Sequence, residues 1–293
     1  MQNILLSLTV VFSLLSGTTA GAGEWNAKKV QTLDGFDIPE CVVVDAKQNV
    51  AYVSNVVAPR KGSGYDRFWK HDGTGFVSRL KLPAEVDMMR WQQSSPRLPL
   101  HGPKGMCIHG GWLWAADIDR VVRFPLAGGE AEVVAVPGAQ ALNDMATDGS
   151  AAYVTDIKAG KCYRLRDGGK HEEIPAPPGI NGITFFQGRM YGASWGEKDV
   201  YELDPAGTKP PRPFGLKSHF QTPDGIEVLD DGTFLVSDSE GNQVVTVAPD
   251  GRTIRKIIET EAPADIGFDR GRVLLYVPLF FAGRVEVYQL EKK

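Results

Sequence analysis

Four oxygen-bearing side chains recur at matching places in the sequence, each just before a run of residues typical of a β-strand. They are Glu40, Asn143, Asn181 and Asp224. Two carboxylates and two amides suit a hard divalent cation, above all Ca²⁺, whereas zinc sites in proteins use imidazole or thiolate ligands. Asn and Asp also favour turns, so one such residue alone would indicate only a turn. Four at equivalent places of a repeat predict a metal site, provided that the fold brings them together.

Two further positions of the same kind hold Lys104 and Asp265. A carboxylate beside a bound cation can accept a proton from an attacking water, so Asp265 is a candidate catalytic base. Lys104 is a candidate for binding a carboxylate or hydroxyl group of the substrate, with a lysine that merely extends to solvent as the alternative. Trp195 follows a predicted strand and is a second substrate-binding candidate, although packing between strands is the default role of such a residue.

The elements that would position these residues form a sixfold repeat. Six segments begin with a turn that leads into a strand, and their marker residues lie 38 to 64 residues apart. The markers are Glu40, Lys104, Asn143, Asn181, Asp224 and Asp265. Each segment continues with a second strand that closes on a small or acidic residue and then with a third strand. A unit of about 40 residues with three or four short strands is typical of a propeller blade.

We therefore predict an all-β fold, a single six-bladed β-propeller. No segment shows the 3.6-residue apolar rhythm of a helical repeat. The strand-like residues 29–33 precede the first marker, and we expect them to close the ring as the outer strand of the last blade. The inner strands would line a central channel, where the markers converge. The insertion over residues 60–75 is expected either to cap one end of this channel or to pack against the first blade.

Composition excludes several function classes. The chain has 293 residues with a formal net charge of −4, and 42% of them are hydrophobic. These values exclude a disordered chain and a polytopic membrane protein, and they leave no basic surface for nucleic acid. The 33 glycines and 19 prolines favour many short strands. The cysteines Cys41, Cys107 and Cys162 are expected to be buried free thiols, with one bridge between Cys41 and Cys107 as the alternative.

The first 22 residues contain no charged side chain. An apolar run over residues 4–15, followed by small residues over 16–22, predicts a signal peptide over 1–22 and a propeller domain over 23–293. We expect a periplasmic or secreted protein that does not insert into a membrane after the leader is removed. Because the leader lacks Lys and Arg, a buried apolar strand or an N-terminal helix is the alternative.

The motifs around the markers resemble those of the gluconolactonase, regucalcin and luciferin-regenerating enzyme family, with squid-type diisopropylfluorophosphatase and paraoxonase as more distant relatives. The resemblance covers about residues 25–290 and is carried by Pro39-Glu40, Asn143-Asp144, Asn181-Gly182-Ile183 and Pro223-Asp224-Gly225-Ile226. It implies that Glu40, Asn143, Asn181 and Asp224 hold the catalytic divalent metal, and that Asp224 is also a candidate catalytic base. Some relatives place a catalytic His on the sixth blade, where this chain has Asp265.

The expected function is Ca²⁺-dependent hydrolysis of a lactone or small ester, sugar-derived, by an exported monomer. The metal would act as a Lewis acid on the carbonyl group. The alternative is a non-catalytic propeller that binds a small ligand or a protein and holds calcium for structure only. A strictosidine-synthase-like condensing enzyme ranks third, because it would not need four oxygen donors. A metal site that opens onto a pocket would distinguish an enzyme from a sealed structural site.

Overall fold

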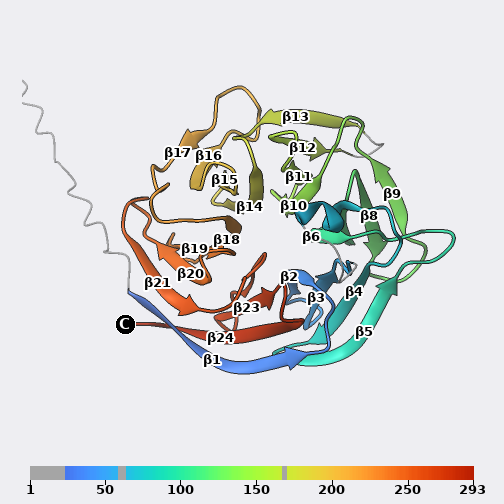
Figure 1. Ribbon diagram of the computed structural model, residues 1–293, viewed down its shortest axis with the longest axis horizontal. Helices are drawn as coiled ribbons and strands as arrows, with labels where there is room; N and C mark the ends of the chain where they lie inside the picture. Colours follow the sequence, from blue (N-terminus) through green and yellow to red (C-terminus); the bar gives the residue numbers. More distant parts are fainter. Residues whose placement is uncertain (1–23, 59–63, 167–169) are drawn as a thin grey trace, which may run out of the picture.

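The computed structural model describes residues 24–58, 64–166 and 170–293, which form six four-stranded sheets arranged in a ring (Figure 1). The prediction of an all-β, six-bladed propeller is confirmed. The predicted signal peptide over 1–22 lies outside the described residues. Within the described ranges the one helical element is the 3-10 helix η1 (Tyr65–Trp69), and no helix there is long and apolar enough to cross a membrane.

Blades 1 to 5 each take four consecutive antiparallel strands, ordered from the channel outward. Blade 1 contains β2 (Pro39–Asp45), β3 (Val50–Asn55), β4 (Phe76–Lys81) and β5 (Glu85–Gln93), and blade 2 contains β6 (Pro103–His109), β7 (Trp112–Asp117), β8 (Arg120–Pro125) and β9 (Glu132–Ala135). Blade 3 contains β10 (Leu142–Thr147), β11 (Ala152–Asp156), β12 (Lys161–Leu165) and β13 (His171–Pro175). Blade 4 contains β14 (Ile180–Phe186), β15 (Arg189–Ser194), β16 (Asp199–Leu203) and β17 (Arg212–Pro213). Blade 5 contains β18 (Pro223–Val228), β19 (Phe234–Asp238), β20 (Gln243–Val247) and β21 (Ile254–Glu259).

Blade 6 joins the two ends of the described chain. It contains β22 (Gly267–Asp269), β23 (Leu274–Leu279), β24 (Arg284–Lys292) and, as its outer strand, β1 (Trp25–Asp34). Strands β1 and β24 run antiparallel from the Trp25–Lys292 pair to the Asp34–Arg284 pair, side by side at the rim of the ring (Figure 1). The predicted closing strand is therefore confirmed, and it removes the free edge that β24 would otherwise present.

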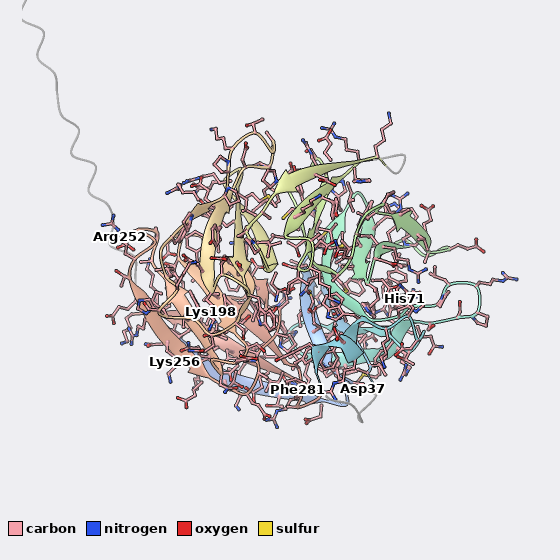
Figure 2. All side chains as sticks on the ribbon, turned by 45° about the horizontal axis from the view of Figure 1, so that its top comes forward. Asp37, His71, Lys198, Arg252, Lys256 and Phe281 are labelled. Carbon is pink, nitrogen blue, oxygen red and sulfur yellow. The ribbon has the colours of Figure 1, made fainter. Side chains whose placement is uncertain are left out.

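The core lies between neighbouring blades. The second strands are almost entirely buried, and their side chains pack across the gap to the next blade: Trp114 of blade 2 shares a cluster with Val154 of blade 3, as Tyr191 of blade 4 does with Val236 of blade 5. The fourth strands are more exposed, and charged side chains such as Lys256 lie at the outer edge (Figure 2). This packing fixes the inner strands around the channel.

Candidate functional site

The four predicted metal ligands occupy the same position on four inner strands. Each is the second residue of its strand, on β2, β10, β14 and β18, and the four residues are Glu40, Asn143, Asn181 and Asp224. All four line one cavity of about 420 Å³ at one end of the channel. The glutamate and the two asparagines are buried, and Asp224 is partly buried. The structure thus brings together residues that lie up to 184 positions apart.

A β-bulge directs these side chains into the cavity. In each of the first five inner strands the pairing register shifts just after the first residue, for example between Pro223 and Ile226. The shift releases the marker residue and its successor from the ladder. In blades 1, 3 and 5 the backbone N–H of the successor then donates to a hydroxyl of the second strand, as Gly225 N does to Ser237 Oγ at 2.8 Å and Asp144 N does to Thr155 Oγ1 at 2.8 Å. Blades 2 and 4 have an alanine at that place.

The small or acidic residues that close the second strands had no role assigned from sequence, and the structure gives them one. Thr155-Asp156 and Ser237-Asp238 are positioning residues: the hydroxyl holds the bulge, and the following carboxylate holds the loop that enters the inner strand. Asp238 Oδ1, for instance, accepts from the backbone N–H of Thr222 at 2.7 Å, directly before β18. Blades 1, 3 and 5 carry a signal for this role in the sequence, because their second strands end in Ser54-Asn55, Thr155-Asp156 and Ser237-Asp238.

Each predicted ligand has one buried side-chain oxygen without a hydrogen-bond partner. These atoms are Glu40 Oε2, Asn143 Oδ1, Asn181 Oδ1 and Asp224 Oδ1. An unpaired buried oxygen is unfavourable, and four on residues that share one cavity require a common partner. Only oxygen donors are involved, which fits a hard cation such as Ca²⁺. The residues therefore fit the divalent cation that the resemblance implies.

The electrostatics of the cavity also favour a cation. Burial raises the pKa of Asp224 to about 7, against the opposing effects of an Asn181 hydrogen bond and the Lys104 charge. The pKa of Glu40 is raised well above its usual range, first by burial and then by the negative charge of Asp224. A divalent cation between these carboxylates would stabilise their charged forms and reverse both shifts.

Lys104 lies at the cavity, but its ammonium group already has partners. Lys104 Nζ donates to the backbone oxygen of Phe68 at 3.0 Å and lies 4.4 Å from the centre of the Trp69 ring. Both partners belong to η1, in the insertion after β3. Burial lowers the pKa of Lys104 to about 8. Trp195, the other predicted substrate-binding residue, also lines the cavity.

Asp265 is not at the position that the repeat alignment gave it. Pro263 pairs with Leu279 as Pro223 pairs with Asp238, so the residue of blade 6 equivalent to Asp224 is Ala264. The hydrogen bonds agree, because Ser237 Oγ donates to the oxygen of Ala264 as Thr155 Oγ1 donates to that of Asn181. A comparison of Pro223-x-x-Ile226 with Pro263-x-x-Ile266 would have given this register from sequence.

The shift of one residue removes Asp265 from the lining of the cavity. Its side chain lies instead beside those of Cys41 and Asp144, and one ligand atom from each lies within 4.8 Å of the others. All three residues are buried, and burial raises the pKa of Asp265 well above its usual range. Asp224 thus faces the cavity, whereas Asp265 belongs to a second group of side chains.

The three cysteines are free and buried, as expected. The bridge between Cys41 and Cys107 that the sequence left open is not formed.

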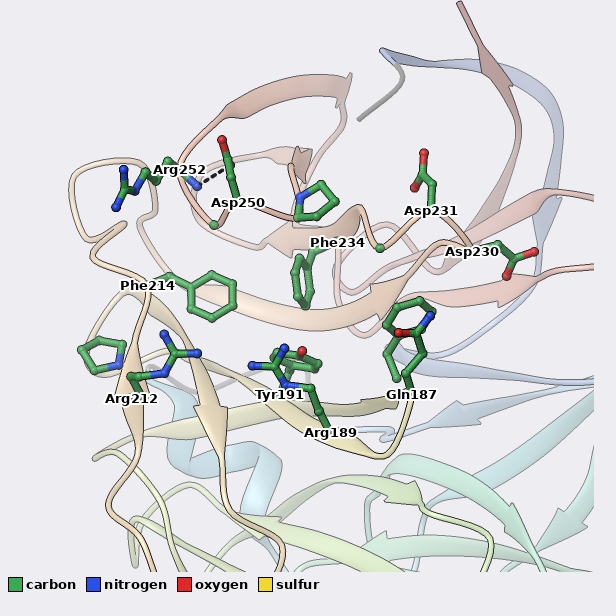
Figure 3. A pocket seen from close by; sticks show the side chains of 15 residues that line it. Gln187, Arg189, Tyr191, Arg212, Phe214, Asp230, Asp231, Phe234, Asp250 and Arg252 are labelled. Carbon is green, nitrogen blue, oxygen red and sulfur yellow. Dashed lines mark hydrogen bonds between the residues drawn. The ribbon is translucent and has the colours of Figure 1, made fainter. Parts of the chain in front are cut away.

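A larger cavity, of about 600 Å³, lies between blades 4 and 5 (Figure 3). Its lining includes Arg189 and Arg212, both paired with Glu202, and Asp230, whose Oδ1 is 2.9 Å from Arg270 Nη1. These charged groups already pair with one another or with neighbouring side chains. This cavity is therefore a weaker candidate for a catalytic or metal site than the channel cavity.

Comparison with known proteins supports the fold. No protein-family model matches the sequence, and no curated protein is similar to it in sequence. A solved structure proposed to be a gluconolactonase is similar with a TM-score of 0.67 and 18% identity, over 94% of this chain and 94% of that chain. A luciferin-regenerating enzyme has a TM-score of 0.61 and 14% identity, over 91% and 95%. Virginiamycin B lyase from Staphylococcus aureus has a TM-score of 0.63 and 14% identity, over 91% and 99%.

At identities of 14 to 18% these similarities show a shared fold, and the activity has to be inferred from the residues of the site. The chain has the overall fold of the gluconolactonase-like and luciferin-regenerating structures.

Proposed function

We propose that the chain is a divalent-metal-dependent hydrolase of a lactone or small ester, with Ca²⁺ as the metal. The observation that carries the proposal is the set of four unpartnered oxygens on residues that line an open cavity. A site that opens onto a cavity leaves room for a substrate carbonyl beside the cation.

The residues of the cavity have different proposed roles in the reaction. Glu40, Asn143, Asn181 and Asp224 would hold the cation, which supplies Lewis-acid polarisation of the ester carbonyl when bound. Asp224 lines the cavity, and we assign to its carboxylate the role of the general base, which would accept a proton from the water that attacks the carbonyl. Asp265 is the poorer candidate, since it does not line the cavity.

We include export in the proposal, because the predicted leader over residues 1–22 would direct a monomer to the periplasm or the medium. The partner would be the small-molecule substrate.

Two substitutions test the mechanism. Asp224→Asn keeps the size and one oxygen ligand but removes the charge, so calcium affinity should fall moderately and turnover by about a hundredfold or more. Asn181→Asp adds a carboxylate and should hold calcium at least as tightly. We would measure hydrolysis of a panel of lactones and aryl esters, together with calcium-dependent melting. Asp34→Asn, at an exposed position of β1, serves as the control.

The outcomes separate the enzyme from a binding module. Equal turnover of wild type and Asp224→Asn at saturating calcium would remove Asp224 from the mechanism. No hydrolysis by the wild type across the panel, with calcium still stabilising the fold, would favour the non-catalytic propeller.

A further inference from the structure

The segment that contains η1 lies over the mouth of the channel and contacts the other blades. From blade 1 it reaches Lys104 of blade 2 through the Phe68 carbonyl. Tyr65 Oη donates to Glu240 Oε1 of blade 5 at 3.2 Å, and the ring of Phe68 lies 4.9 Å from that of Phe280 in blade 6. These contacts anchor η1 as a cap, which decides between the two roles that the sequence left open for the insertion.

The cap gives the cavity an aromatic wall. The centroids of Tyr65 and Trp195 lie 5.5 Å apart in an edge-to-face contact, and those of Tyr65 and Phe68 lie 6.0 Å apart. Phe280 and Phe281 continue the series, with centroids 5.1 Å apart. Six aromatic residues line the cavity: Tyr65, Phe68, Trp69, Trp195, Phe280 and Phe281. They come from the cap, from the β15–β16 turn and from the β23–β24 turn.

The predicted metal ligands lie on the inner strands and not on the cap or the two turns. Three other polar residues also line the cavity, namely Asp66, Lys158 and Ser239. The oxygens of Glu40, Asn143, Asn181 and Asp224 form the floor, where the cation would bind. The ammonium group of Lys104 donates to the Phe68 carbonyl of the cap. A polyhydroxylated sugar can stack its C–H faces on aromatic rings, but each hydroxyl group that loses water in the cavity needs a hydrogen-bond partner. Of the polar residues outside the metal-ligand set, Asp66 and Lys158 already pair with each other at 3.8 Å. A flat apolar group would instead lose unfavourable water contact there.

We propose that the substrate of this site is a lactone or ester that carries an aromatic or similarly flat apolar group. The carbonyl group would lie on the oxygen floor and the apolar group against Phe68, Phe281 and Trp195. This inference rests on the proposed hydrolase function for its reacting group, but the wall is a separate observation. It replaces the sugar-derived substrate expected from sequence.

Three six-membered lactones test the substrate class, because they share the reacting ring. They are glucono-δ-lactone, unsubstituted δ-valerolactone, and δ-valerolactone with a phenyl group on the carbon beside the ring oxygen. In the presence of calcium, kcat/KM should be about tenfold or more higher for the phenyl lactone than for the other two. A preference for glucono-δ-lactone would overturn the proposal.

Two exposed wall residues allow a variant that still folds. Tyr65 and Phe281 are 46% and 51% exposed, so the double variant Tyr65→Ser, Phe281→Ser keeps the core intact. We expect it to lower kcat/KM for the phenyl lactone about tenfold more than for unsubstituted δ-valerolactone, mainly through KM. Val133→Ser, an exposed apolar position on β9, is the matched control. An equal loss for both lactones would contradict an aromatic-binding wall.

A binding measurement keeps this inference separate from the hydrolase proposal. The corresponding lactams resist hydrolysis and have the same shape, so calorimetry gives their affinities whether or not the lactones turn over. Tighter binding of the phenyl lactam, lost in the double variant, would support the substrate class even if no lactone were hydrolysed. Equal binding of the phenyl and unsubstituted lactams would overturn it even if both lactones were substrates.

Discussion

Carboxylates buried without a cation make the stability of the fold depend on pH. Burial raises the pKa of Asp224 to about 7 and that of Glu40 well above its usual range. In the unfolded chain such groups titrate near about 4, so the metal-free folded protein keeps protons that the unfolded chain loses. The stability that these groups contribute is therefore fully present below about pH 4 and is lost as the pH rises toward about 7.

At the residue scale, we expect calcium to raise Tm more at about pH 8 than at about pH 5, by about 5 °C or more. The reason is that calcium binds the charged carboxylates, whose burial is otherwise unfavourable at the higher pH. Thermal unfolding of protein stripped of divalent ions on a chelating resin, with and without added calcium, measures this. In Asp224→Asn the calcium-induced rise in Tm should differ less between the two pH values. If calcium raised the Tm of the wild type equally at both pH values, the metal assignment would be contradicted.

At the scale of the element, the inner strands approach one another so closely that glycine is required. A Cβ atom on Gly182 of β14 would lie 2.1 Å from the backbone oxygen of Asp224 on β18. One on Gly267 of β22 would lie 2.2 Å from the oxygen of Val42 on β2. Both are contacts between neighbouring blades, so glycine allows the inner strands to pack closely around the channel. Gly182 in particular determines how close the backbone of the metal-ligand residue Asp224 can lie.

We predict that Gly182→Ala lowers the free energy of unfolding by about 1–3 kcal/mol and weakens calcium binding, because the new methyl group must displace the Asp224 backbone. Chemical denaturation and calcium titration would measure the two effects. Gly271→Ala is the control, since its Cβ would meet only Asp269 Oδ1 at an ordinary 3.5 Å. If Gly182→Ala lost stability but bound calcium normally, the link between this close approach and the metal site would be wrong.

At the scale of the whole molecule, the ring depends on a strand from the other end of the described chain. Strand β1 covers the edge of β24, and Leu33 is buried in a cluster with Val53 and Tyr276 of blades 1 and 6. Lys29 Nζ lies 2.9 Å from Glu286 Oε1 across the same pair of strands. Removal of β1 would expose both an apolar seam and a row of unpaired backbone groups.

We expect a chain that begins at residue 35 to melt about 10 °C or more below one that begins at residue 24, and to associate as its concentration rises. Differential scanning calorimetry and size-exclusion chromatography at several concentrations would test both effects. Equal melting and a monomeric elution of the shorter chain would show that the ring does not need its closing strand.

The sequence alone determined the repeat and, with it, the architecture and the four oxygen donors. This was possible because the strands of blades 1 to 5 pair with their neighbours along the chain, so the strand and turn pattern of each unit is a local property. Glu40, Asn143, Asn181 and Asp224 could be aligned because each follows the same turn and precedes the same strand.

Only the tertiary structure decided the character of the cavity wall. The register of blade 6 is carried by Pro263 and Ile266, but the alignment followed the acidic residue and misplaced Asp265 by one position. The aromatic wall joins Tyr65 to Trp195 and Phe68 to Phe280, residues 130 and 212 positions apart, through contacts that no repeat pattern encodes. Likewise, Lys104 has the marker position of a ligand-binding residue, but the cap supplies its partners, since the insertion is unique to one blade.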